Sequence, residues 1–189
     1  LVENPTYLGA LQAFNMYGAE FVTVPTDDDG MVTDWLEDAL RCGPKFIYAL
    51  PNFQNPSGVT MPFDRRTALI RASDQYGIPI IEDDPYGQLR YEGEHIKPLV
   101  VIDAEHLQCE HNGRYTGNVI YLSTFSKTLA PGLRMAWMVA PKEVINRLVQ
   151  AKQGPDPQSS TFDQRRTLPL GPVGFHRRPC PRSLGGSVP

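Results

Sequence analysis

The sequence predicts an α/β protein with a mostly parallel sheet flanked by helices, followed by an irregular C-terminal tail. Short apolar runs of strand length alternate with amphipathic segments of helical period along the first 155 residues. Glycine, proline and capping residues separate them. Strands that alternate with helices indicate parallel pairing through right-handed crossovers.

The first half of the chain contains three predicted strands and two predicted helices. Leu1–Glu3 has the pattern of a strand end, and the segment Tyr7–Tyr17 predicts a helix that ends before Gly18. The other elements are a strand at Phe21–Val24, an acidic turn at Thr26–Gly30, a helix at Thr33–Leu40 with Thr33 as its N-cap, and a strand at Phe46–Ala49.

The second half continues the alternation. Pro62–Tyr76 predicts a helix with Pro62 in its first turn and Gly77 after its end. The polar connection Glu92–Gly117 is long, and its apolar run predicts a short strand at Leu99–Ile102. The remaining elements are strands at Ile78–Ile81, Val119–Leu122 and Met135–Val139, and a helix at Val144–Lys152.

Composition excludes several classes of protein. A net charge of −3 gives no footprint for nucleic acid or an anionic membrane, and no apolar stretch approaches transmembrane length. The three cysteines, Cys42, Cys109 and Cys180, are too widely spaced for a disulfide framework or a zinc site, which fits a cytoplasmic location. No metal site is expected, because the four histidines lack ligand spacing: His95, His106, His111 and His176.

A lysine follows one of the buried strands directly. Lys127 lies between small hydroxyl residues after the run Val119–Leu122, and lysine is seldom buried without a partner. Its amine is suited to forming a Schiff base with an aldehyde. Arg134, seven residues later, is suited to holding a dianion. On these two residues alone, a surface lysine after a strand is an equally good interpretation.

Polar clusters follow two further strands. Asp83 and Tyr86 come after Ile78–Ile81, and Asn55 follows Phe46–Ala49. Open α/β sheets bind ligands outside the carboxyl ends of their strands. An aspartate, a tyrosine, an asparagine, a lysine and an arginine converging there would suit a pyridine ring that carries a phenolic oxygen, an aldehyde and a phosphate.

With these motifs the sequence resembles the fold type I aminotransferases of class I and II, which depend on pyridoxal 5'-phosphate. It is most similar to their 2-aminoadipate and kynurenine aminotransferase branch. The resemblance assigns catalytic roles to three residues. Lys127 in Ser-Lys-Thr-Leu matches the Schiff-base lysine, Asp83 in Asp-Asp-Pro-Tyr matches the aspartate under the pyridine nitrogen, and Tyr86 matches the tyrosine at the ring oxygen.

The resemblance also implies how the cofactor is held. Asn55 in Asn-Pro-Ser-Gly matches the asparagine that bonds the ring oxygen, and Tyr7 matches the aromatic residue that stacks on the ring. Thr124, Ser126 and Arg134 match the phosphate-binding positions. Other interpretations remain for single residues: Asn55 in a surface turn, Tyr7 in the core, and Asp83 as a turn acid, which is the interpretation preferred for Asp84.

The resemblance covers residues 1–155, which therefore predict part of a cofactor-binding large domain. Residues 156–189 predict an irregular segment, either a natural disordered tail or sequence from a reading-frame error. The family's upstream phosphate loop and its substrate-carboxylate arginine find no match, so the chain resembles a fragment. We therefore expect that these 189 residues alone do not form a competent enzyme, and that the full-length protein is a homodimer.

The function that the resemblance implies is transfer of an amino group between an amino acid and a 2-oxo acid. An alternative is an aminotransferase-like sensor domain of a GntR-type transcription regulator, in which the cofactor serves sensing. A related lyase or decarboxylase on the same scaffold is a third possibility.

Overall fold

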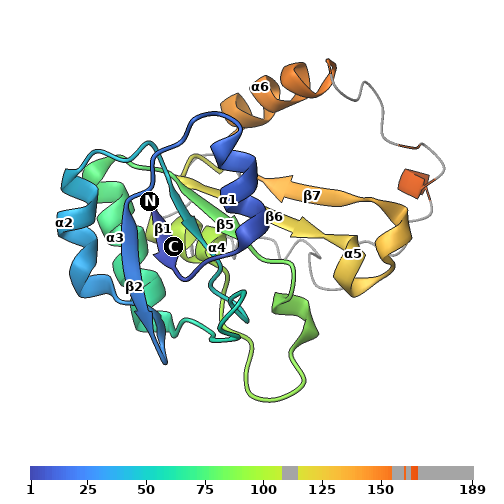
Figure 1. Cartoon of the computed structure of the whole chain (residues 1–189). Coiled ribbons are helices and arrows are strands. Elements are labelled where there is room, and N and C mark those ends of the chain that lie inside the picture. Colours follow the sequence, from blue (N-terminus) through green and yellow to red (C-terminus); the bar gives the residue numbers. More distant parts are fainter. Residues whose placement is uncertain (108–114, 155–159, 161–162, 166–189) are drawn as a thin grey trace, which may run out of the picture.

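The computed structural model describes residues 1–107, 115–154, 160 and 163–165. These residues form one seven-stranded sheet in the order β3-β2-β1-β4-β5-β6-β7, with helices on both faces (Figure 1). The strands are β1 Val2–Asn4, β2 Thr23–Asp27, β3 Gly30–Met31, β4 Ile47–Ala49, β5 Ile80–Asp83, β6 Val119–Thr124 and β7 Ala136–Val139. The helices are α1 Leu8–Asn15, α2 Leu36–Arg41, α3 Phe63–Tyr76, α4 Leu99–His106, α5 Phe125–Thr128 and α6 Lys142–Lys152.

The five central strands are parallel, which confirms the predicted fold class. Strand β1 pairs with both β2 and β4, and β5 lies between β4 and β6. The two edge strands are antiparallel: β3 closes a hairpin with β2, and β7 returns beside β6. Most of the predicted tail, residues 156–189, lies outside the described residues.

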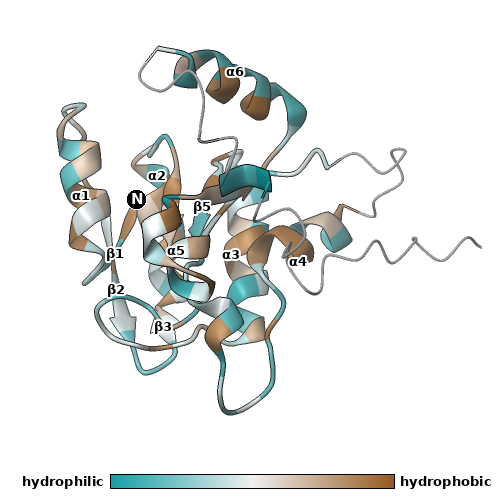
Figure 2. Ribbon diagram, turned by 90° about the vertical axis from the view of Figure 1, so that its right-hand side faces the viewer, coloured by the Kyte–Doolittle hydropathy of each residue, from teal (hydrophilic) through white to brown (hydrophobic). Residues whose placement is uncertain are grey.

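Helices cover the two faces of the sheet unequally. The larger core lies between the sheet and helices α2, α3 and α4, and includes Leu40, Leu69 and Leu99. Helix α1 packs on the other face, where Phe14 contacts Tyr48 edge-on. Figure 2 shows α1 on one side of the sheet and α3 and α4 on the other.

Helix α3 follows from its local sequence. Pro62 occupies its N-cap, and Gly77 ends it in the left-handed conformation at φ +62°. Its buried positions, Arg66, Leu69, Ile70 and Ser73, fall on one stripe at helical spacing. Two predicted caps are wrong. Helix α1 ends at Asn15 before it reaches Gly18, and Thr33 begins a short 3₁₀ turn without capping it through its side chain.

The predicted strand at Leu99–Ile102 is wrong, because these residues open helix α4. The cause is Glu82 on β5, which is fully buried. Its two carboxyl oxygens accept the backbone N–H groups of Leu99 at 2.8 Å and Val100 at 3.0 Å. Those are first-turn donors that an α-helix leaves without an internal partner. A capping carboxylate from another strand cannot be deduced from the apolar run itself.

Replacing Glu82 with alanine is expected to destabilise the fold by roughly 2–4 kcal/mol, because two buried N–H groups would lose their acceptors. Denaturant unfolding of the purified chain measures this loss. The matched control is Glu105→Ala, which removes an exposed ion pair with Lys97 and should cost less than about 1 kcal/mol. Equal losses in the two variants would contradict the capping role.

A second buried acid makes the stability depend on pH. Glu3 is 1% exposed, and burial raises its pKa to about 7. The folded state therefore holds a proton that the unfolded chain releases near its ordinary value of 4.5. Stability from this site is present at low pH and is lost as the pH rises through about 7. Melting temperatures from pH 5 to 8 should fall in the natural chain, and the fall should be shallower in Glu3→Gln.

Candidate active site

The parallel strands β2, β1, β4, β5 and β6 all end at the same edge of the sheet. The chain leaves β1 toward β2 on one side and later crosses back to β4 on the other, so the order reverses between β1 and β4. A crevice outside the strand ends at such a point is where open α/β sheets bind ligands.

A pocket of about 400 Å³ lies at this edge. Its volume is in the range of small-molecule sites. All eight site residues predicted from the sequence line it. They come from the last residues of β5 and β6 and from the segments after β1, β4, β5 and β6, and lie beside Leu50 and Pro85: Tyr7, Asn55, Asp83, Tyr86, Thr124, Ser126, Lys127 and Arg134.

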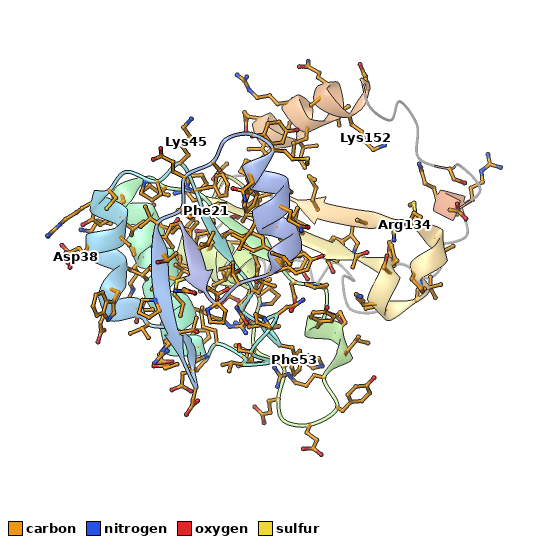
Figure 3. All side chains as sticks on the ribbon, viewed as in Figure 1. Phe21, Asp38, Lys45, Phe53, Arg134 and Lys152 are labelled. Atoms are coloured by element: carbon orange, nitrogen blue, oxygen red, sulfur yellow. The ribbon has the colours of Figure 1, made fainter. Side chains whose placement is uncertain are left out.

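A second hollow of about 470 Å³ lies on the α1 side, lined by residues 1–2, 14, 17–22 and 42–46. Phe21 and Lys45 belong to it and lie well apart from Arg134 in Figure 3. Glycines and apolar side chains make up most of its lining. The smaller pocket is the candidate site because an acid, several hydroxyls, an amine and a guanidinium converge there.

The end of β5 directs two consecutive acids to opposite faces. Asp83 lines the pocket, and its Oδ2 accepts a 2.6 Å hydrogen bond from the Tyr48 hydroxyl. Asp84 is 3% exposed and accepts the Gly87 N–H and the Tyr121 hydroxyl, both at 2.9 Å. Because successive side chains of a strand alternate, only one of the two carboxylates reaches the pocket.

Lys127 is carried by the short helix α5 at the end of β6. The Thr124 hydroxyl caps this helix by accepting the Ser126 N–H at 3.1 Å. The Lys127 side chain is exposed, and its Nζ lies 5.8 Å from the centre of the Tyr86 ring. The amine thus faces an aromatic side chain from the neighbouring strand end, and both residues line the pocket.

Arg134 lines the pocket from the turn between α5 and β7 (Figure 3). Its backbone is left-handed at φ +49°, a conformation that costs a residue with a side chain roughly 1–3 kcal/mol. The guanidinium is exposed, with one long hydrogen bond of 3.4 Å to the Pro131 carbonyl. Four of its five N–H donors therefore have no hydrogen-bond acceptor among the described residues.

Sequence reasoning missed a buried arginine that braces the loop carrying Asn55. The guanidinium of Arg66 is completely buried and donates to the carbonyls of Pro51 and Met61 and to Asn52 Oδ1. These acceptors lie at the two ends of the loop. Its position in the sequence could have revealed this role. Arg66 lies on the face of α3 that is buried against the sheet, and a buried arginine needs hydrogen-bond partners.

Sequence reasoning also missed Tyr48, which is 2% exposed. Alternation along β4 places its side chain on the face opposite Ile47 and Ala49, the face that α1 covers. A buried tyrosine hydroxyl usually has a hydrogen-bond partner. The partner, Asp83, is on the next strand and follows only from the strand register.

The described residues contain no group of three or more metal-ligating side chains and no helix of a length and hydropathy that could cross a membrane. His95 and His106 are exposed. His111, His176, Cys109 and Cys180 lie outside the described residues.

Residues 1–155 match the family model of the class I and II aminotransferases. The chain belongs to this family. An aromatic-amino-acid aminotransferase of Thermococcus litoralis is 47% identical over 170 residues, covering 87% of this chain and 38% of the relative. A 2-aminoadipate transaminase of Thermus thermophilus is 41% identical over 179 residues, covering 94% of this chain and 43% of the relative.

A solved structure has the same fold as this aminotransferase-family chain. The α-aminoadipate aminotransferase of Thermus thermophilus, complexed with N-(5'-phosphopyridoxyl)-L-leucine, superposes with a TM-score of 0.82 at 39% identity. The match covers 92% of this chain and 43% of that one.

A transcriptional regulator is also similar to this chain. An uncharacterised HTH-type transcriptional regulator of Bacillus subtilis is 37% identical over 165 residues, covering 87% of this chain and 32% of the regulator. The chain thus spans about two fifths of the length of the curated aminotransferases it matches.

Proposed function

We propose that this chain is the cofactor-binding core of an enzyme that transfers an amino group between an amino acid and a 2-oxo acid, with pyridoxal 5'-phosphate as cofactor. One observation carries the proposal: the eight residues singled out from the sequence line a single pocket at the strand ends. The proposal extends to a homodimer acting in the cytoplasm.

The pocket offers a partner for each part of pyridoxal phosphate. Asp83 is an acid for the ring nitrogen, and Asn55 and Tyr86 are hydrogen-bonding groups for the ring oxygen. Lys127 supplies an exposed amine for the aldehyde. The guanidinium of Arg134, with its unused donors, and the hydroxyls of Thr124 and Ser126 suit the phosphate. We infer that the residues fit the cofactor.

The chemical roles follow from these placements. When bound, pyridoxal phosphate supplies an aldehyde that condenses with amines and a ring that withdraws electrons. Lys127 Nζ would attach to the cofactor and, once the substrate amine has displaced it, would move a proton as general base and then as general acid. Asp83 would keep the ring nitrogen protonated, and the Tyr7 ring would hold the plane of the cofactor by stacking.

The protein encoded by the complete reading frame containing this chain provides the test. With pyridoxal phosphate it should convert 2-aminoadipate, leucine or kynurenine to the 2-oxo acid while 2-oxoglutarate becomes glutamate. Release of carbon dioxide without amino transfer would instead indicate a decarboxylase, and no amino transfer with any of the three would contradict the proposal.

The similarity to an HTH-type regulator supports a second candidate, a cofactor-binding sensor domain. Both functions would use the same cofactor pocket, but they differ in what cofactor binding leads to. A sensor would bind pyridoxal phosphate and alter the DNA affinity of the same complete protein, without steady turnover of amino acids. Gel-shift measurements with and without cofactor, made beside the transamination assay, separate them.

Replacing Arg134 with lysine is expected to weaken cofactor binding roughly tenfold while changing the substrate KM little. The positive charge remains, but the two-pronged hydrogen bonding of the guanidinium is lost. Fluorescence titration with pyridoxal phosphate measures the affinity for the cofactor, and steady-state kinetics measure the substrate KM. The control is Arg90→Lys, because Arg90 stacks on Phe53 outside the pocket. A change in KM alone would assign Arg134 to the substrate.

A further inference from the structure

The hydroxyl of Tyr48 contacts Asp83, the acid that lines the pocket. It lies on β4, directly beside β5, and its hydroxyl is 2.6 Å from Asp83 Oδ2. The side chain is 2% exposed, and its ring packs against Phe14 of α1 with 5.5 Å between ring centres. The phenol is therefore held on both sides, by the sheet and by the helix, and its hydroxyl has one fixed acceptor.

The two oxygens of Asp83 are used differently. Oδ2 accepts the Tyr48 hydroxyl, whereas Oδ1 accepts no hydrogen bond from the described residues. The carboxyl lines the pocket that also holds Lys127 and Arg134. One oxygen is thus tied to the scaffold, and the other is left for a donor that enters the pocket.

The direction of this hydrogen bond is fixed. Burial, followed by the negative charge of Asp83, raises the pKa of Tyr48 far above its ordinary value, so the phenol always donates. Burial raises the pKa of Asp83, and the hydrogen bond from Tyr48 opposes that rise. The other titratable groups acting on the pair are Asp84 directly after β5, Glu3 on β1 and Tyr7 at the start of α1.

We propose that Tyr48 is a positioning residue for cofactor recognition: its hydroxyl fixes Oδ2 of Asp83, so that Oδ1 is presented to the protonated ring nitrogen of pyridoxal phosphate. This inference rests on the proposed function. It adds a specific role: Tyr48 makes the pocket select a ring that carries a nitrogen, through a residue that does not itself line the pocket.

The chain contains a matched control for this pair. Tyr121 on β6 donates to Asp84 at 2.9 Å, so a tyrosine on each strand beside β5 bonds one of the two consecutive acids. Tyr121 is also 2% exposed, but Asp84 does not line the pocket. Tyr48→Phe and Tyr121→Phe each remove one hydroxyl and one hydrogen bond to an aspartate. Only Tyr48→Phe removes a hydrogen bond to Asp83, the aspartate that lines the pocket.

The experiment compares two ligands on the purified protein encoded by the complete reading frame. Pyridoxal phosphate and its 1-deaza analogue, in which C–H replaces the ring nitrogen, share the aldehyde and the phosphate. The ratio of their dissociation constants therefore isolates the contribution of the nitrogen. Tyr48→Phe should reduce the preference for pyridoxal phosphate roughly tenfold or more, the effect of one hydrogen bond to a charged group. Tyr121→Phe should leave the ratio unchanged.

The pH dependence gives a second readout. Acidification protonates Asp83, and the preference for pyridoxal phosphate should then disappear. Without the Tyr48 hydroxyl the pKa of Asp83 rises, because the opposing hydrogen bond is gone. The pH at which the preference is half lost should therefore move upward in Tyr48→Phe and stay in place in Tyr121→Phe.

The outcomes separate the two claims. Equal weakening for both ligands in Tyr48→Phe, or an unchanged ratio and pH midpoint, would overturn the role of Tyr48. Failure of the complete natural protein to bind pyridoxal phosphate would remove the proposed function and this inference together. If Tyr48→Phe does not fold, 3-fluorotyrosine placed at position 48 alone keeps the shape and strengthens the donor. Its pH midpoint should then fall, and an unmoved midpoint would refute the proposal.

Discussion

Replacing Lys127 with alanine is expected to abolish covalent retention of pyridoxal phosphate and to lower transamination by roughly 10²- to 10⁴-fold or more. The amine is the group proposed both to attach to the cofactor and to move the substrate proton. Its position above the Tyr86 ring, 5.8 Å from the ring centre, places it within the pocket. Gel filtration after loading measures retention, and single-turnover kinetics measure the proton transfer.

A matched lysine distinguishes this role from a general loss of charge. Lys142 is exposed at the start of α6 and does not line the pocket. Lys142→Ala should retain the cofactor and the rate. An added primary amine, supplied in solution, should restore part of the rate to Lys127→Ala by acting as an external base. Undiminished turnover in Lys127→Ala would remove Lys127 from the mechanism.

Asp83→Asn and Asp84→Asn are expected to fail in different ways. The first should lower kcat/KM by roughly 10²- to 10³-fold, because a neutral amide cannot stabilise the protonated ring nitrogen from its place in the pocket. The second should leave kcat/KM nearly unchanged. Instead it should lower stability by roughly 1–2 kcal/mol, since Asp84 is buried and accepts the Gly87 N–H and the Tyr121 hydroxyl.

Steady-state kinetics and thermal melting of the same two variants provide the comparison. The physical reason for the split is the alternation of side chains along β5, which sends neighbouring acids to opposite faces. Equal kinetic losses in both variants, or the larger loss in Asp84→Asn, would reverse the assignment.

Much of the fold followed from local sequence because each element agrees with its neighbours. Apolar runs of strand length alternate with helical segments, and Gly77 ends α3 as predicted. The site followed for a related reason: polar residues placed just after parallel strands must meet at one edge. That rule brought together Tyr7 and Lys127, which are far apart along the chain.

The wrong strand at Leu99–Ile102 and the two residues that were missed have a common cause in tertiary contacts. Leu99–Ile102 has the length and composition of a strand, but the carboxyl of Glu82, on another element, accepts the N–H groups of its first two residues and favours a helix there. The sequence did not single out Arg66 or Tyr48, because their partners lie on other segments. Arg66 donates to backbone carbonyls, and Tyr48 donates to an acid on the next strand. A sequence pattern shows that such residues face inward, but their partners depend on how the segments pack.

The most direct test of the proposed function is to locate the attachment site of the cofactor on the protein. Borohydride reduction in the presence of pyridoxal phosphate fixes the attachment as a stable bond, and peptide mass mapping then identifies the modified residue. We predict one adduct on Lys127, which is prevented by an excess of a cofactor analogue that lacks the aldehyde and is absent from Lys127→Ala. An adduct on another lysine, with Lys127 unmodified, would contradict it.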